Sequence, residues 1–164
     1  MDRKDNRLKN YDYSQNGAYF ITICVKDMEC ILSTVKNVGD GALDVPETIL
    51  SEYGIIVENE IQKMNDIYEN INAVSFIIMP NHVHLLLIIS NTNGTSRAPS
   101  PTNSVVARYV STLKRMTNKK SGTALWQRSY YDHIIRNEED YINHLQYIDE
   151  NPKKWLIGKD EYYV

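Results

Sequence analysis

Apolar and polar positions along the chain follow two different patterns. Four short stretches are rich in apolar, β-branched and aromatic residues, which is typical of strands. They are 18–26, 72–79, 83–90 and 129–136. Three longer stretches repeat apolar residues at helical spacing. They are 46–68, 104–119 and a last one from Asn137 to the Asn151-Pro152 pair.

Prolines and polar runs separate these stretches. Pro46 suits the first turn of the first helix, and Pro80-Asn81 argues against a continuous helix between the second and third strands. We expect loops at 37–44 and 91–103. The order β-α-β-β-α-β-α predicts an α+β sandwich, in which a mainly antiparallel sheet carries its helices on one face.

Composition points to a single globular domain. The chain has 164 residues, of which 42% are hydrophobic and 24% charged, and we expect one domain over 1–164 with peripheral tails at 1–17 and 156–164. No apolar run approaches the length of a membrane span, and the first residues lack the apolar core of a signal peptide. We therefore expect a cytoplasmic protein without a membrane partner. Cys24 and Cys30 are expected to be reduced thiols.

Charge is unevenly distributed. The net charge of -3 argues at first against a nucleic-acid partner, but there is no Asp or Glu between Asn70 and Tyr131, where seven basic residues lie. A locally basic surface could hold a polyanion although the whole chain is slightly acidic. The same residues could also be ordinary solvated helix faces.

Two histidines, His82 and His84, stand at the start of an otherwise apolar strand. Residues i and i+2 of a strand project to the same face, so the two imidazoles would lie side by side and could be two ligands of one metal ion. Surface histidines and hydrogen-bonded core histidines give the same spacing. A metal site therefore needs at least one further ligand from elsewhere.

The last predicted helix can offer that ligand. Four polar residues fall within an arc of about 60° on it, at 100° per residue. They are Asp140, His144, Tyr147 and Asn151. If the neighbouring apolar stripe docks on the sheet, this polar stripe reaches the histidine pair. Simpler roles stay open, because Asp140 suits a helix N-terminus and Asn151 before Pro152 suits a helix end.

Three segments, taken together, carry specific motifs. They are YFITICVKD at 19–27, MPNHVHLLL at 79–87 and LWQRSYYDHIIRNEEDYINHLQYIDENPKKW at 125–155. In this order they resemble the REP-associated tyrosine transposases, which are small single-tyrosine members of the HUH endonuclease superfamily. The resemblance implies a ferredoxin-like α+β fold whose central strand carries the two histidines.

The resemblance also implies a chemistry. His82 and His84 match the metal ligands, Tyr147 matches the nucleophilic tyrosine, and Asn151 stands where relatives place a third polar ligand. The expected activity is metal-dependent nicking and rejoining of DNA through a 5′-phosphotyrosine intermediate. The expected cofactor is a divalent ion, Mg²⁺ or Mn²⁺, and the expected partner is single-stranded or hairpin-forming, REP-like DNA. The family contains monomers and homodimers, so the oligomeric state stays open.

Eight residues are candidate DNA contacts because they could neutralise phosphates. They are Arg108, Lys114, Arg115, Lys119, Lys120, Arg128, His133 and Arg136. Some of them could also assist ionisation of the tyrosine, and Trp126 could stack on a base.

Two other classes of function stay open. One is a catalytically inactive, ferredoxin-like nucleic-acid-binding protein. The other is a metal-dependent hydrolase that activates water, for which Asp140 is the one carboxylate placed to act as base.

Overall fold

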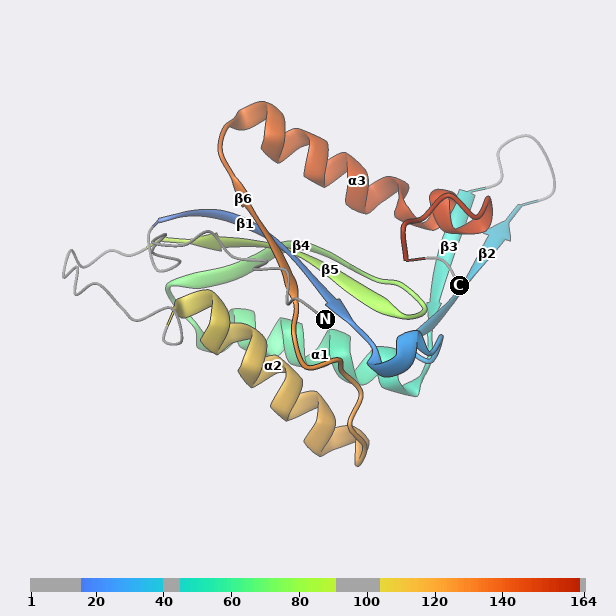
Figure 1. Cartoon of the computed structure of the whole chain (residues 1–164), viewed down its shortest axis with the longest axis horizontal. Coiled ribbons are helices and arrows are strands. Elements are labelled where there is room, and N and C mark those ends of the chain that lie inside the picture. The colour runs from blue at the N-terminus through green and yellow to red at the C-terminus, as the bar shows by residue number, and fades with distance from the viewer. Residues whose placement is uncertain (1–15, 40–44, 91–103, 163–164) are drawn as a thin grey trace, which may run out of the picture.

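The computed structural model describes residues 16–39, 45–90 and 104–162. Its centre is an antiparallel sheet of four strands in the order β4-β5-β1-β6 (Figure 1). The strands are β1 (Gly17–Cys24), β4 (Ile71–Ile78), β5 (His82–Ile89) and β6 (Tyr131–Ile135). All four predicted strands are present, and the predicted α+β, ferredoxin-like fold class is confirmed.

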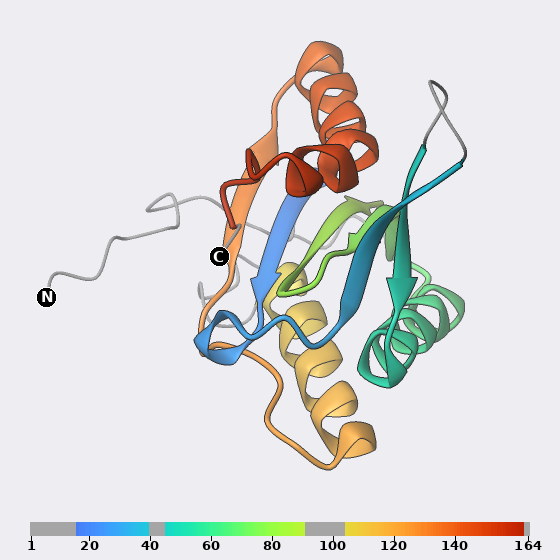
Figure 2. The same cartoon turned by 90° about the vertical axis from the view of Figure 1, so that its right-hand side faces the viewer.

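Three helices cover this sheet. They are α1 (Glu52–Ile67), α2 (Val105–Ser121) and α3 (Glu138–Leu156). Helices α1 and α2 lie on one face and α3 on the other (Figures 1 and 2). None of these helices is both long and apolar enough to cross a membrane, as far as the described part of the chain extends.

The expectation that all helices share one face is wrong for α3. Alternate residues of β1 point to opposite layers, so that Tyr19 and Ile21 join the core formed with α1 and α2, while Phe20 packs with Ile148 of α3. Strand β5 is buried at almost every position. A strand that is apolar on both faces needs a layer on each side, and α3 supplies the second.

A hairpin that the sequence analysis does not predict stands beside the main sheet. It consists of β2 (Ser33–Val38) and β3 (Val45–Leu50), and a short 3₁₀ turn, η1 (Lys26–Met28), precedes it. The predicted first helix therefore begins too early, because Ser51 is its N-cap and accepts a hydrogen bond from the Gly54 N–H at 3.2 Å. Of the predicted loops, 91–103 and most of 37–44 lie outside the described residues.

Helix α3 continues through Pro152 to Leu156, past its predicted end. A proline inside a helix removes one backbone hydrogen bond. The additional turn buries Trp155 against Val35 of β2 and Met79, and this packing offsets the loss. The predicted starts of the other two helices are confirmed, since Ser104 is the N-cap of α2 and Asn137 is the N-cap of α3.

Gly54 gives a stability prediction. A methyl group added there would stand 2.2 Å from the Leu32 carbonyl oxygen, and that oxygen is held in place by hydrogen bonds from Ser51. We expect Gly54→Ala to lower the free energy of unfolding by about 3 kcal/mol in a urea titration. Gly17→Ala is the matched control, because its nearest neighbour is 3.9 Å away. Equal stability of the two variants would contradict this packing.

Candidate active site

His82 and His84 project from β5 toward α3. In the register of the sheet, His84 pairs with Thr22 and His82 with Cys24 of β1. Both histidines are 0% exposed, and their ring centroids are 4.5 Å apart. The two imidazoles therefore share one face, as the strand period predicts.

Hydrogen bonds determine which nitrogen of each imidazole is free. The Asn81 side-chain amide donates to the Tyr162 carbonyl at 2.8 Å, which turns the Asn81 Oδ1 toward His82 Nδ1, also at 2.8 Å. Because an amide oxygen can only accept, His82 Nδ1 carries the proton and Nε2 keeps its lone pair. His84 Nδ1 bonds to Thr22 Oγ1 at 2.8 Å. Neither Nε2 atom has a hydrogen-bond partner within the described residues.

Burial keeps both imidazoles neutral. It lowers the pKa of His82 to about 3, although the nearby Asn151 amide acts in the opposite direction. Burial, followed by the neighbouring His82 and His144, holds the pKa of His84 well below its ordinary value. A neutral imidazole with a free Nε2, and with Nδ1–H bonded to a neighbour, is the form that binds a metal ion.

Helix α3 brings Asn151 and Tyr147 to the histidine pair. The Tyr147 ring stands edge-on to His84, with centroids 5.2 Å apart, and also contacts Phe20. Asn151 is 0% exposed, and neither atom of its amide has a hydrogen-bond partner within the described residues. An unpaired buried amide costs about 1–3 kcal/mol. Two imidazole nitrogens and one amide oxygen, all buried and unpaired, fit the ligand set of a divalent metal ion.

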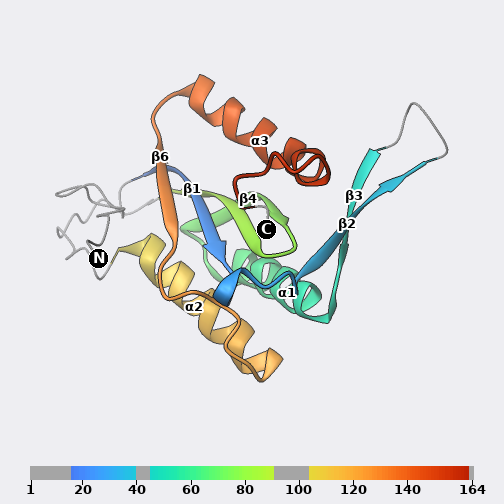
Figure 3. The same ribbon diagram turned by 45° about the vertical axis from the view of Figure 1, so that its right-hand side comes forward.

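The chain after α3 turns back over this site (Figure 3). Gly158, at φ 64°, makes the turn. The Tyr162 ring then lies 4.6 Å from the His82 ring, and the Tyr147 hydroxyl donates to Glu161 Oε1 at 3.3 Å. Residues 160–162 therefore cover the histidine pair, where the sequence predicts a peripheral tail. Gly158, soon after the helix, is a local sequence signal for this change in chain direction.

The surroundings of Tyr147 disfavour its ionised form. Burial is the largest cause and the Glu161 and Asp160 carboxylates add to it, so the pKa of the phenol is raised above its ordinary value. Asn151 acts in the opposite direction but is weaker. Tyr147 is thus a neutral phenol at pH 7, and any use of it as a nucleophile needs help with the proton.

Replacing Glu161 tests this electrostatic balance. Glu161→Gln removes a negative charge beside the phenol, so the pKa of Tyr147 should fall and the phenolate fraction at pH 7 should rise. We expect the phenolate fraction of Tyr147 at a given alkaline pH to rise about three- to tenfold in the protein without DNA, since that fraction changes tenfold per pKa unit. It is measured as the tyrosinate absorbance that is lost when Tyr147→Phe is added. Asp149→Asn, which removes a charge from the exposed side of α3, should leave this titration unchanged. An unchanged titration in Glu161→Gln would contradict the electrostatic effect.

Comparison with known proteins assigns the family. A family model described as IS200-like transposase matches residues 48–151. This chain belongs to the IS200-like transposase family. It is 31% identical over 178 residues to an uncharacterized protein of Haemophilus influenzae, covering 99% of this chain and 93% of that protein. The family consists of proteins that cut and join DNA, and the resemblance in the sequence analysis is confirmed.

Two further similarities concern REP-associated tyrosine transposases. This transposase is 23% identical over 142 residues to the REP-associated tyrosine transposase of Escherichia coli K12, covering 87% of this chain and 70% of that protein. The structure of a REP-associated tyrosine transposase bound to a REP hairpin superposes with a TM-score of 0.62 at 19% identity. The match covers 90% of this chain and 73% of the other. At 19% identity this match shows that the two proteins share a fold.

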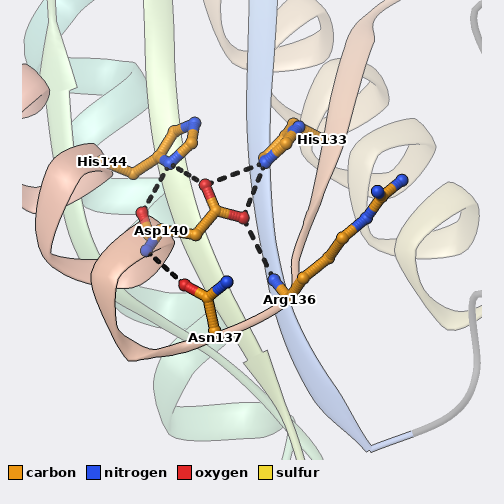
Figure 4. A network of polar contacts seen from close by, with 5 residues as sticks. All are labelled: His133, Arg136, Asn137, Asp140 and His144. Atoms are coloured by element: carbon orange, nitrogen blue, oxygen red, sulfur yellow. Dashed lines mark hydrogen bonds and ion pairs between the residues drawn. The ribbon is translucent and has the colours of Figure 1, made fainter.

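A second polar cluster of the transposase lies where β6 passes into α3 (Figure 4). His133 Nε2 is 2.9 Å from Asp140 Oδ2, which also accepts the Arg136 N–H at 3.0 Å. His144 Nδ1 is 3.1 Å from Asp140 Oδ1. Burial acts to raise the pKa of Asp140, but the bonds from His133 and Arg136 outweigh it, and the net pKa is lowered. Both oxygens of the Asp140 carboxylate therefore already have partners, whereas a hydrolase that activates water requires a carboxylate free to accept a proton.

The basic residues of the transposase do not gather at the histidine pair. Arg108, Arg115 and Lys119 are exposed on α2, across the sheet from α3. Arg128 and Arg136 are exposed beside β6. Lys120 forms an ion pair with the buried Glu60.

Lys114 and Trp126 have structural partners. The Lys114 ammonium donates to the carbonyls of Gln127, Arg128 and Ser129, and burial lowers its pKa to about 8. Its three protons are thus used in fixing the segment that leads to β6. Trp126 is buried and donates to Thr117 Oγ1 at 2.7 Å, so its ring is not free to stack on a base.

Proposed function

We propose that this transposase nicks and rejoins single-stranded DNA at hairpin-forming, REP-like sequences, with Tyr147 as the nucleophile and a divalent metal ion, Mg²⁺ or Mn²⁺, as cofactor. One observation carries the proposal. The free Nε2 atoms of His82 and His84 and the amide of Asn151 are buried without hydrogen-bond partners in the described structure, and the His84 ring lies 5.2 Å from the Tyr147 ring. No packing requirement explains three such groups in one place.

His82, His84 and Asn151 would hold the metal ion. Their donor atoms, two neutral imidazole nitrogens and an amide oxygen, leave further coordination positions for phosphate oxygens and water. When bound, the ion supplies a positive charge that polarises the scissile phosphate and favours the phenolate form of Tyr147. The hydrogen bond that His82 Nδ1 donates to Asn81 Oδ1, and the hydrogen bond between His84 Nδ1 and Thr22 Oγ1, keep the two imidazoles in the required orientation.

Tyr147 would carry out the covalent step. Its phenolic oxygen attacks the phosphorus and loses its proton to water, while the bond from phosphorus to the 3′ oxygen breaks and that oxygen takes a proton from water. The products are a 5′-phosphotyrosine and a free 3′-hydroxyl. Attack of a 3′-hydroxyl on the phosphotyrosine runs the same step backwards and rejoins DNA. The phosphodiester energy is conserved, so no nucleotide cofactor is required.

DNA can enter only if the covering segment moves. His82 and His84 are 0% exposed beneath Tyr162, and Tyr147 is bonded to Glu161. A strand placing a phosphate at the histidine pair must therefore displace residues 160–162. Arg136 and Arg128 are available beside β6, and Arg108, Arg115 and Lys119 of α2 are candidates for contacts with a hairpin stem. The relative bound to a REP hairpin supports a hairpin as the substrate.

A labelled hairpin oligonucleotide tests the proposal. We expect a covalent protein–DNA band on a denaturing gel in the presence of Mn²⁺ or Mg²⁺, and its loss when a chelator is added. Cleavage without attached protein would favour a hydrolase that uses water. Binding without cleavage under either metal ion would favour an inactive DNA-binding protein.

A further inference from the structure

The cluster of His133, Asp140 and His144 lies outside the set of side chains used for the proposed reaction. His133 is on β6, opposite Phe20 in the sheet register, and therefore points to the face that α3 covers. Asp140 and His144 are one turn apart on α3, and their side chains point toward His133 (Figure 4). A strand residue and two helix residues thus converge on one point.

The distances in this cluster suit a metal ion. One ligand atom from each side chain can be chosen such that all three lie within 4.8 Å of one another. The pairs are 2.9 Å apart for His133 Nε2 and Asp140 Oδ2, and 3.1 Å apart for His144 Nδ1 and Asp140 Oδ1. Atoms bound to one ion at the usual Zn–N and Zn–O lengths lie about 3.0–3.5 Å apart. Two of the three pairs thus already lie near these distances, and a bound ion would replace the hydrogen bonds that now join them.

Neighbouring groups orient the ligands. The Arg136 N–H holds Asp140 Oδ2, and the Asn137 side chain caps the Asp140 N–H at 2.8 Å. The rings of His133 and His144 stack at 4.7 Å with an interplanar angle of 18°. In metal sites, hydrogen bonds from neighbouring groups commonly fix the orientation of a ligating carboxylate. A simple helix cap needs Asn137 and Asp140 but neither imidazole.

We propose that His133, Asp140 and His144 form a second metal site, which takes a divalent transition-metal ion such as Zn²⁺, Mn²⁺ or Co²⁺. Two imidazoles and one carboxylate prefer these ions to Mg²⁺ and leave open coordination positions. The His133 side chain is 46% exposed, so water or an anionic ligand can reach those positions. In the ion-bound form His144 Nδ1 exchanges its bond to the Asp140 carbonyl, at 2.8 Å, for the metal ion.

The experiment isolates this site from the first. Full-length protein carrying His82→Ala and His84→Ala is titrated with Zn²⁺ and with Co²⁺, and bound metal is counted after gel filtration. We expect one equivalent of metal, micromolar or tighter affinity by calorimetry, and visible Co²⁺ absorption bands of a site with nitrogen ligands. Adding His133→Ala or His144→Ala should weaken binding at least tenfold. Asp140→Asn should also weaken it while keeping an oxygen that accepts the Arg136 N–H.

Circular dichroism and thermal melting establish that each variant is folded. Metal binding that persists in the variant lacking all four histidines, or that needs millimolar metal, would overturn the proposal. So would the absence of binding in folded protein that retains the cluster. Because the readout is metal binding in a variant without the first site, the result does not depend on whether Tyr147 cuts DNA.

Discussion

Tyr147→Phe abolishes the covalent adduct with a labelled hairpin oligonucleotide and slows nicking by roughly 10⁴-fold or more, if Tyr147 is the nucleophile. The change removes one oxygen atom and keeps the ring that packs against Phe20 and His84. The fold and the metal site should therefore survive, and the variant should still bind the oligonucleotide. Binding is measured by fluorescence anisotropy, and cleavage on a denaturing gel.

Tyr141→Phe is the matched control for this experiment. Tyr141 lies on the same helix and packs against the same apolar cluster as Tyr147. It should form the adduct at the rate of the unmodified protein. Persistent cleavage by Tyr147→Phe, with no protein attached to the DNA, would show that water attacks the phosphate instead.

Loss of His82 and His84 should remove the first metal site. In protein that carries His133→Ala and keeps the first site, Mn²⁺ at 100 times its dissociation constant should raise the free energy of unfolding by about 2.7 kcal/mol. We expect His82→Ala/His84→Ala to lose that stabilisation at this site, to bind Mn²⁺ there more than about 100-fold more weakly, and to form no adduct. Because the cluster of His133, Asp140 and His144 is proposed to bind Mn²⁺ as well, the comparison is made in protein that carries His133→Ala. An unchanged metal-dependent stabilisation would contradict the assignment.

The same pair gives a pH dependence without metal. The pKa of His82 is lowered to about 3 and that of His84 is lowered as well, so both stay neutral in the folded state. In the unfolded chain they bind protons below about pH 6.5. Stability is therefore lost as pH falls below that value, by up to about 1.4 kcal/mol per pH unit for each histidine. In urea titrations from pH 7 to pH 5, the double alanine variant should lose less stability than the unmodified protein.

Much of the fold could be predicted because its signals are local. The strands follow from short apolar runs, and Ser104 and Asn137 mark helix starts by their capping chemistry. The hairpin of β2 and β3 escaped prediction because its strands are short and partly exposed, and because Pro46 resembles a helix start. The position of α3 had an available signal, since a strand as uniformly apolar as β5 requires cover on both faces.

In the candidate site, likewise, some features follow from local sequence patterns and others depend on long-range contacts. The shared face of His82 and His84 follows from the period of a strand, and the arc that carries Tyr147 and Asn151 follows from the period of a helix. The return of the chain over the histidines depends on long-range contacts, such as the bond from Asn81 to the Tyr162 carbonyl. No local pattern encodes a contact between residues so far apart in sequence. Which imidazole nitrogens lack a hydrogen-bond partner can therefore be established only from the three-dimensional structure.

The most direct test of the central claim is the site of covalent attachment. The adduct formed with a hairpin oligonucleotide and Mn²⁺ is digested with nuclease and trypsin, and the peptide that follows Arg136 is sequenced by tandem mass spectrometry. That peptide contains both Tyr141 and Tyr147. The mass of a 5′-phosphonucleotide on Tyr147 is the expected result. The same mass on Tyr141 or on another residue would contradict the account.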